Sequence, residues 1–256
     1  MKEMSSVSSP IKICLAGVTG WVGRALLMEI INSEDLEIVS AVSRSGAGKS
    51  LQEVFNVGAD IIIDGSVKEA LAKDCDVLID YTSPKVVKEN VLYAISKNVN
   101  VVIGTSGLTE DDFEEIKLVA LKNEVGVLAA GNFAITAVLV EHFAEIAARF
   151  IPQWEIIDYA PDRKPDAPSG TTRELAFRLS KIRKPYIEHP IDETIGDKSS
   201  RGATVNEMQI HSVRLPGFVS SFEIIFGLAN ERLMMRHDSG NGAEPYVQGT
   251  LLVREM

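Results

Sequence analysis

Short apolar runs alternate with helix-spaced segments along the first half of the chain. The apolar runs predict strands at residues 11–16, 36–42, 61–63, 76–81, 99–103 and 125–130. The segments between them predict helices at residues 24–31, 67–71, 86–98 and 109–121. Strands that alternate with helices at these spacings need crossover connections. The expected fold class is therefore α/β, with a doubly wound, mostly parallel sheet of the Rossmann type.

The pattern changes after residue 134. A long apolar helix is expected at residues 135–150, and a strand with one solvated face at residues 154–159. A further helix is expected to open at Thr171-Thr172-Arg173-Glu174, which has the spacing of a capping box. The remaining strands are expected without helices between them, at residues 204–213, 217–226 and 231–237. This order favours a second α+β domain on a mixed or antiparallel sheet.

A glycine-rich loop follows the first expected strand and precedes the first expected helix. It reads Gly17-Val18-Thr19-Gly20-Trp21-Val22-Gly23, with the spacing G-x-x-G-x-x-G. Such a loop turns tightly, lets the backbone approach a pyrophosphate and offers the amides of a helix N-terminus to it. The strand before it and the helix after it are the context that the motif requires. We therefore expect residues 17–22 to bind a dinucleotide.

The end of the second expected strand bears on the choice of cofactor. An acidic residue there would bind the ribose hydroxyls of NAD, but the chain has Ser43-Arg44 instead. Arg44, with Lys49 as a possible addition, can meet the 2′-phosphate of NADPH. The sequence thus favours NADPH and leaves NADH possible; the alternative is a solvated basic loop.

Two more loops follow expected strands at the edge where ligands of such sheets bind. One is Gly104-Thr105-Ser106, and the other is Gly131-Asn132-Phe133-Ala134. Both are expected to flank the nicotinamide half of the cofactor.

Composition limits the other partners. A net charge of -10 and a pI near 5.0 disfavour binding to nucleic acid or to an anionic membrane. No apolar run reaches membrane-spanning length. Cys14 and Cys75 lie in apolar runs, which indicates reduced thiols and a cytoplasmic location. No Cys/His spacing suggests a metal site.

A turn made rigid by two prolines is expected to lead into the N-terminus of a helix. The stretch reads Lys164-Pro165-Asp166-Ala167-Pro168-Ser169-Gly170-Thr171-Thr172. The amides of Gly170 and Thr171, the helix dipole and nearby hydroxyls together suit a carboxylate or a phosphate. Lys164 can add a charge or a proton, and Arg163 can hold a second carboxylate. The alternative is a capped helix after a proline-rich loop.

The chain resembles the 4-hydroxy-tetrahydrodipicolinate (dihydrodipicolinate) reductase family of lysine biosynthesis. The matching motifs span nearly the whole chain in the family's order: the glycine loop, Gly104-Thr105-Ser106-Gly107, Gly131-Asn132-Phe133, Asp166-Ala167-Pro168-Ser169-Gly170-Thr171, His211-Ser212-Val213-Arg214-Leu215-Pro216-Gly217 and Arg236-His237-Asp238-Ser239.

The resemblance implies an NAD(P)H-dependent reductase of a carboxylated cyclic imine that assembles as a homotetramer. It implies that Lys164 is the catalytic residue, which holds or protonates the substrate, and that Ser169, Gly170 and Thr171 grip a carboxylate. The expected domains are a disordered tail at residues 1–10, a dinucleotide-binding domain at residues 11–133 with about 240–256, and a substrate-binding and oligomerisation domain at residues 134–239.

One departure from the family bears on the chemistry. The family usually has a histidine pair just before the lysine, where this chain has Ala160-Pro161. Because reduction of a conjugated imine needs a proton as well as a hydride, Lys164, Tyr159, Asp162 or water must supply it, or the substrate differs.

Two alternatives stay open from the sequence. One is an NADPH-dependent imine reductase or dehydrogenase with another substrate, and the other is a catalytically inactive homologue that binds the cofactor. A short-chain dehydrogenase is a poor fit, because Tyr159 and Lys164 lack the Tyr-x-x-x-Lys spacing.

Overall fold

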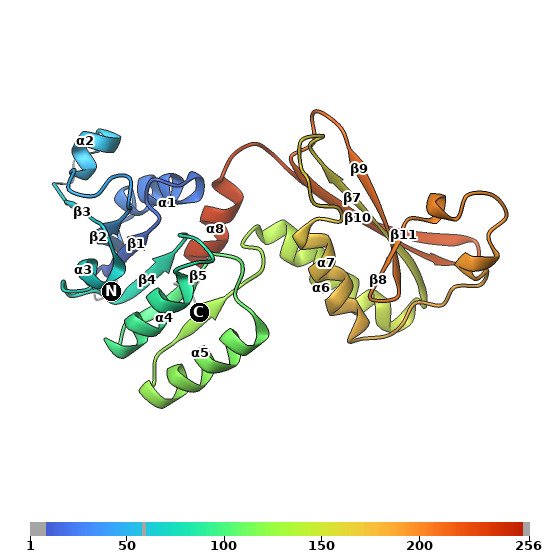
Figure 1. Ribbon diagram of the computed structural model, residues 1–256, viewed down its shortest axis with the longest axis horizontal. Helices are drawn as coiled ribbons and strands as arrows, with labels where there is room; N and C mark the ends of the chain where they lie inside the picture. Colours follow the sequence, from blue (N-terminus) through green and yellow to red (C-terminus); the bar gives the residue numbers. More distant parts are fainter. Residues whose placement is uncertain (1–8, 58–59, 253–256) are drawn as a thin grey trace, which may run out of the picture. The chain divides into compact units, whose positions relative to one another are not determined.

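The computed structural model describes residues 9–57 and 60–252, and the chain divides into two compact units (Figure 1). One unit takes the chain up to Gly131 and again from Tyr246, and the other comprises Asn132–Pro245. The tail expected at residues 1–10 lies, for residues 1–8, outside the described residues.

A six-stranded sheet forms the centre of the first unit. All its pairings are parallel, and the strand order is β3-β2-β1-β4-β5-β6. The order reverses between β1 and β4, which is the switch point where ligands of doubly wound sheets bind. This confirms the expected Rossmann-type fold class. The strands are β1 (Ile11–Ala16), β2 (Leu36–Val42), β3 (Ile63–Asp64), β4 (Val77–Asp80), β5 (Asn100–Ile103) and β6 (Val127–Ala129).

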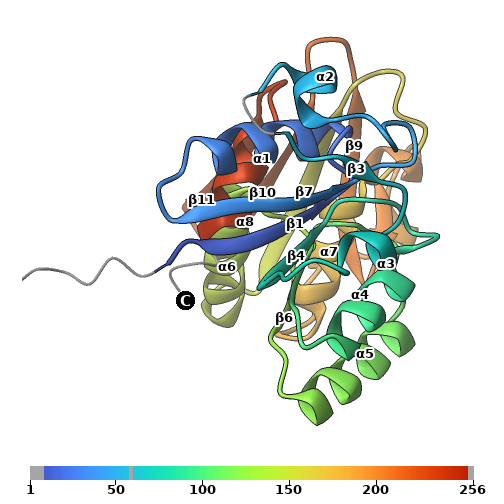
Figure 2. The ribbon, with the colours of Figure 1, turned by 90° about the vertical axis from the view of Figure 1, so that its left-hand side faces the viewer.

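Helices cover both faces of this sheet. Figures 1 and 2 show α1 and α8 on one side and α3, α4 and α5 on the other. The core on the second side joins residues of α3, α4 and α5 to Cys14, Leu78 and Val101 of the strands. The helices are α1 (Trp21–Ile31), α2 (Leu51–Phe55), α3 (Val67–Ala70), α4 (Val87–Ser96), α5 (Glu110–Asn123) and α8 (Glu244–Leu252).

The second unit is built on a mixed sheet of five strands in the order β11-β10-β7-β9-β8. Only β7 and β9 pair in parallel, which confirms the expectation of a mixed sheet. Helices α6 (Ile135–Phe150) and α7 (Gly170–Ser180) pack together on one face. The strands are β7 (Gln153–Ala160), β8 (Ala203–Val205), β9 (Met208–Arg214), β10 (Ser220–Leu228) and β11 (Glu231–Ser239). The short 3-10 helices Ile191–Glu193 and Lys198–Arg201 interrupt the polar segment between α7 and β8.

Strand β7 alternates between the two faces of its sheet. Trp154, Ile156, Asp158 and Ala160 are buried, and the residues between them are half-buried on the other face. The period of two in a strand sends neighbouring side chains to opposite faces. This alternation places Asp158 under the helices and Tyr159 away from them.

The expectation of a single strand at residues 204–213 is wrong. The chain turns back at Asn206 and Glu207, whose φ angles are 48° and 66°, and forms the hairpin β8–β9. A two-residue hairpin turn with both φ angles positive matches the right-handed twist of the flanking strands. The next strand also begins at Ser220, three residues later than expected.

Candidate functional site: a nucleotide crevice and an anion-binding helix start

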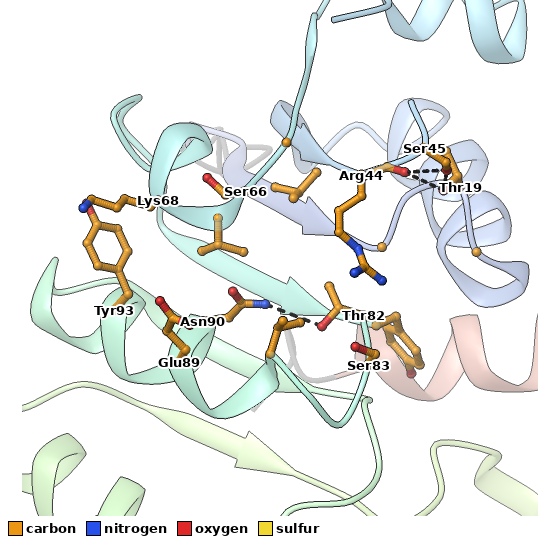
Figure 3. Close-up of a pocket in the computed structure, with 18 residues that line it drawn as sticks. Thr19, Arg44, Ser45, Ser66, Lys68, Thr82, Ser83, Glu89, Asn90 and Tyr93 are labelled. Carbon is orange, nitrogen blue, oxygen red and sulfur yellow. Dashed lines mark hydrogen bonds between the residues drawn. The ribbon is translucent and has the colours of Figure 1, made fainter. Parts of the chain in front are cut away.

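The first unit has a cavity of about 760 Å³ beside the glycine loop (Figure 3). Its walls come from the loops after β1, β2, β3 and β4, together with α3 and α4. It therefore opens at the carboxyl ends of the strands, beside the switch point between β1 and β4. Among the expected cofactor residues, Gly17, Thr19, Gly20, Ser43 and Arg44 line it.

Close backbone packing explains the glycines of the loop. Gly17 has a φ of +89°, and a Cβ there would lie 2.1 Å from the carbonyl oxygen of Tyr81. A Cβ on Gly23 would lie 2.1 Å from the carbonyl oxygen of Gly17. Helix α1 begins directly behind this turn, at Trp21, so its first-turn amides have no partner within the helix. This is the arrangement that a pyrophosphate needs.

Within the expected segment 17–22, Val18, Trp21 and Val22 do not line this cavity, and neither do the expected segments 104–106 and 131–134. Val18 is fully buried, and its amide donates to the carbonyl oxygen of Val42 at 3.2 Å. Trp21 is 54% exposed and packs edge-on against Tyr246, with 5.5 Å between the ring centroids. Trp21 and Val22 lie in the first turn of α1, so their contribution to anion binding would come from the backbone.

The loop after β2 presents a cation to the cavity. Figure 3 shows the Arg44 side chain reaching into the cavity from the side of Thr19 and Ser45. Ser43 is buried and its hydroxyl lies 2.7 Å from that of Thr19. Lys49 is not among the residues that line the cavity, whereas Lys68 of α3 is. The basic residues that line the cavity are therefore Arg44, on the loop after β2, and Lys68, across the cavity on α3.

A buried carboxylate at the end of β4 organises the next two loops. Asp80 is fully buried and accepts hydrogen bonds from Thr82 Oγ1 and Thr105 Oγ1, both at 2.7 Å, and from Asn90 Nδ2 at 2.8 Å. Its carbonyl oxygen accepts from the amides of Gly104 and Thr105. The side chain of Asp80 thus fixes where the segment 104–106 leaves the sheet. Sequence reasoning missed this role, because the partners lie up to 25 residues away.

Gly104 lies against an aromatic ring. A Cβ at this position would meet the ring of Tyr81 at 2.1 Å, and the Tyr81 hydroxyl lies 2.7 Å from Thr250 Oγ1 of α8. The last expected cofactor segment, residues 131–134, lies where the chain passes from one unit to the other. There the Asn132 side chain accepts from the amide of Ala134, at the start of α6.

The second unit contains the stretch at residues 164–172 that is expected to bind an anion. A turn at residues 161–164 follows β7, with the amide of Lys164 donating to the carbonyl oxygen of Pro161 at 3.0 Å. The Lys164 ammonium lies 2.8 Å from Asp166 Oδ1, and Arg163 is exposed. The ion pair with Lys164 lowers the pKa of Asp166, so that carboxylate is charged at neutral pH.

Helix α7 begins at Gly170 with Ser169 as its N-cap, so the capping box expected at Thr171-Thr172-Arg173-Glu174 is wrong. The Ser169 hydroxyl accepts from the amide of Thr172 at 3.4 Å and lies 2.9 Å from the Thr172 hydroxyl. Thr172 is fully buried inside the first turn. Gly170 and Thr171 are thus the first two helical residues, whose amides have no partner within the helix.

Asp158 of β7 holds the start of α7 in place through hydrogen bonds. It accepts from the amide of Ser169 at 2.9 Å, from Thr172 Oγ1 at 3.1 Å and from an Arg214 guanidinium nitrogen at 2.7 Å. Burial opposes the charge of Asp158, but the hydrogen bonds from Arg214 and Ser169 lower its pKa overall. Sequence reasoning missed both Asp158 and Arg214 as site residues.

The structure narrows the choice of proton donor. Tyr159 lies on the opposite face of β7 from Asp158, where its hydroxyl donates to Glu223 at 3.1 Å. Burial and Glu223 raise its pKa, which makes it a weaker acid. Asp162 is exposed and accepts from the amide of Arg163. Lys164 is the ammonium group nearest in sequence to the free start of α7.

Comparison with known proteins decides the family. The family model "Dihydrodipicolinate reductase, N-terminus" matches residues 11–133, and the model "Dihydrodipicolinate reductase, C-terminus" matches residues 135–256. The chain belongs to the dihydrodipicolinate reductase family. This family binds a nicotinamide cofactor, so the protein is an NAD(P)H-dependent oxidoreductase that resembles 4-hydroxy-tetrahydrodipicolinate reductase.

Relatives of the dihydrodipicolinate reductase family agree over nearly the full chain. The 4-hydroxy-tetrahydrodipicolinate reductase of Desulfitobacterium hafniense strain DCB-2 is 37% identical over 94% of this chain and 91% of its own. That of Listeria innocua is 36% identical over 89% of this chain and 88% of its own. The solved structure "Dipicolinate bound Dihydrodipicolinate reductase from Paenisporosarcina sp. TG-14" is 31% identical, with a TM-score of 0.83 over 95% of this chain and 92% of its own.

Within residues 9–57 and 60–252, no helix is long and apolar enough to cross a membrane. In the same residues, no group of three His, Cys, Asp or Glu side chains is placed to hold a metal ion.

Proposed function

We propose that the protein reduces 4-hydroxy-tetrahydrodipicolinate with NADPH, as a cytoplasmic step of lysine biosynthesis. The observation that carries the substrate assignment is the start of α7, where Gly170 and Thr171 offer first-turn amides six and seven residues after Lys164. A cyclic dicarboxylate matches this pairing of an amide pocket with a cation. The names of the relatives indicate that this dicarboxylate is 4-hydroxy-tetrahydrodipicolinate.

In the proposed reaction the substrate loses its hydroxyl group as water and takes up a hydride and a proton. NADPH supplies the hydride when it is bound. The amides of Gly170 and Thr171 hold one carboxylate at the positive end of α7, with the hydroxyl of Thr171 beside them. Lys164 holds the ring or delivers the proton, and Arg163 reaches a second carboxylate from the exposed turn.

The proposed preference for NADPH is supported by the wall after β2. Ser43 occupies the place of the acid that would bind ribose hydroxyls, and its hydroxyl is turned toward Thr19. The Arg44 guanidinium reaches into the cavity from this wall, whereas Lys68 of α3 lies across the cavity beside Tyr93 (Figure 3). A 2′-phosphate can form charge-assisted hydrogen bonds with the Arg44 guanidinium, and NADH would leave that group unused.

A homotetramer is part of the proposal, and the sheet of the second unit supports it. Helices α6 and α7 pack on one face of this sheet. The other face, called here the open face, carries Ile157 and Tyr159 of β7, Ile225 of β10 and Met234 of β11. Met234 is 61% exposed. An apolar strip across a sheet is typical of an interface between subunits.

The test is the loss of NADPH absorbance with freshly generated substrate, measured for the wild type, Lys164→Ala and the control Lys181→Ala. Lys181 lies at the other end of α7, over the ring of Phe177. The proposal expects turnover in the wild type and the control and a fall of at least ~100-fold in Lys164→Ala. A wild type that binds NADPH without turnover would contradict it.

A second candidate is reduction of another carboxylated imine, and Ala160-Pro161 favours it. Ala160 is buried, and neither residue can donate a proton in place of the family's histidines. If the wild type reduces other imines faster than 4-hydroxy-tetrahydrodipicolinate, this candidate replaces the first. An inactive homologue would reduce none of them.

A further inference from the structure

We propose that Asp158 and Arg214 are positioning residues for the substrate carboxylate, because together they fix the start of α7 and the turn that carries Lys164. The inference rests on the proposed function, in which the first amides of α7 bind that carboxylate. Neither side chain needs to touch the substrate in this role. Both act through the backbone that they hold.

The Asp158 carboxylate accepts hydrogen bonds from the donors at the start of α7 that face the sheet. It is fully buried in β7, and its two oxygens accept from the amide of Ser169, the hydroxyl of Thr172 and the guanidinium of Arg214. Ser212 of β9 donates to it at 3.3 Å. The N-cap residue and the first turn of α7 are thus bonded to a rigid strand. Gly170 is exposed and Thr171 half-buried, so the two next amides stay available to a ligand.

Arg214 bonds the loop before α7 to Asp158. One terminal nitrogen donates to Asp158 Oδ2 at 2.7 Å and to the carbonyl oxygen of Asp166 at 2.8 Å. The other terminal nitrogen donates to the carbonyl oxygens of Val213, at 3.0 Å, and Asp158. Asp166 in turn pairs with the Lys164 ammonium at 2.8 Å. Strand β7, the lysine turn and the start of α7 therefore share one network.

The charges of the network explain why it leaves the helix start attractive to an anion. A lone carboxylate behind the N-cap would satisfy the positive end of the dipole itself. The guanidinium of Arg214 neutralises Asp158 at 2.7 Å. Burying such an ion pair costs desolvation energy that its attraction roughly repays, so it is a weak source of stability. Its value here is geometric, since anion binding requires donors at fixed positions.

The main test is Asp158→Asn, which keeps the volume and removes the charge. We expect the Kd of dipicolinate, measured by calorimetry with NADPH present, to rise ~10- to 100-fold, and the KM for the substrate to rise in parallel. We expect kcat to change less than about three-fold, because the lost contact serves substrate and transition state alike. Partial unfolding would do the opposite, since fewer active molecules lower kcat and leave KM unchanged.

Matched variants separate positioning from loss of stability. Thr172→Val and Ser212→Ala each remove one hydroxyl that donates to Asp158, but only Thr172 belongs to the helix start. We expect Thr172→Val to weaken dipicolinate binding and Ser212→Ala to leave it within about two-fold. Asp80→Asn, at an equally buried aspartate of the first unit, should weaken NADPH binding and spare dipicolinate. If Asp158→Asn does not fold, the Thr172→Val and Ser212→Ala pair decides the question.

The outcomes distinguish this inference from the proposed function. Wild-type turnover tests the function, and the ratios of dipicolinate Kd values between variants test the positioning role. A wild type that binds dipicolinate without turnover would contradict the proposed function. The ratios of the dipicolinate Kd values would still test the positioning role of Asp158 and Arg214. Unchanged dipicolinate affinity in folded Asp158→Asn, or equal effects of Thr172→Val and Ser212→Ala, would overturn it. A wild type that binds no dipicolinate would overturn it as well.

Discussion

Arg44 and Lys68 place positive charge in a cavity of a protein whose net charge is -10. Arg44 offers a planar fork of donors, whereas Lys68 is a single ammonium on a flexible stem. A phosphate monoester binds such a fork through two charge-assisted hydrogen bonds. We therefore expect Arg44 to be the residue that most affects the proposed preference for NADPH over NADH.

We predict that Arg44→Ala raises the KM for NADPH ~10- to 100-fold and changes the KM for NADH less than about three-fold, since hydrogen bonds to charged groups contribute about 1.5–3 kcal/mol. Steady-state kinetics with both coenzymes measures this directly. Lys49→Ala is the control, because Lys49 belongs to the same basic loop but does not line the cavity. An equal rise in KM for NADPH and NADH would show that Arg44 contacts a part of the coenzyme that both share, and not the 2′-phosphate.

Gly23 shows how little space the glycine loop leaves. We predict that Gly23→Ala lowers the melting temperature and weakens NADPH binding, because its Cβ would lie 2.1 Å from the Gly17 carbonyl oxygen and push the loop off the start of α1. Gly240→Ala adds a methyl group where nothing lies within 4 Å and should alter neither property. Thermal melts with and without NADPH compare the two variants. A Gly23→Ala protein with wild-type affinity would show that the loop has room to move.

At the scale of elements, the sequence was sufficient where a local pattern decides the structure. The strands of the first unit, its helices α1, α3, α4 and α5, and the sheet of the second unit follow from periodicity, whereas the short helix α2 was not expected. The start of α7 was misassigned because Ser169 and Thr171 both suit an N-cap, and the choice depends on the bond from Ser169 to Asp158, eleven residues earlier. Asp80 and Asp158 were missed for the same reason, since their partners come from other elements.

The hairpin at Asn206 and Glu207 was missed because a glutamate with positive φ gives little sequence signal. Among the site residues, the glycine loop and Arg44 could be located from the sequence, because the strand–loop–helix order fixes their place. The orientation of Tyr159 could not, since it depends on which face of β7 meets the helices.

The pairing of α6 with α7 contains a buried acid, Glu141, that is held by Arg178 at 3.0 Å. Burial raises the pKa of Glu141 from 4.5 to about 7, with Glu174 and Glu145 adding to the rise and Arg178 opposing it. The folded state thus binds this proton more tightly than the unfolded state. The contribution of the group to stability is complete below its ordinary pKa and is lost as the pH rises through about 7.

We predict that Glu141→Gln, which cannot titrate, gains stability relative to the wild type as the pH rises from about 5 to about 8. Chemical denaturation at the two pH values measures the change in the free energy of unfolding. Glu145→Gln removes the other carboxylate bound to Arg178, at 2.6 Å, and should not reproduce this pH dependence. A constant difference between Glu141→Gln and the wild type would show that Glu141 is charged throughout.

At the scale of the whole molecule, the chain joins the unit with the glycine loop to the unit that contains the proposed anion site. The open face of the second unit, with Ile157, Tyr159, Ile225 and Met234, is the surface that the tetramer proposal needs. We predict that Met234→Glu shifts the protein to smaller species in analytical ultracentrifugation, because a charge buried without a partner opposes association. Met28→Glu places the same charge on an exposed methionine of α1 and should leave the assembly unchanged. A wild type that sediments as a monomer would contradict the proposal.

Transfer of deuterium tests the central claim, that this chain passes a hydride from NADPH to the dicarboxylate ring. NADPH with deuterium at both hydrogen positions of the nicotinamide C4 is mixed with wild-type protein and freshly generated 4-hydroxy-tetrahydrodipicolinate, and the product is examined by mass spectrometry. The account predicts tetrahydrodipicolinate that carries one deuterium atom, and almost none of it with Lys164→Ala. Unlabelled substrate recovered intact beside bound NADPH would contradict the account.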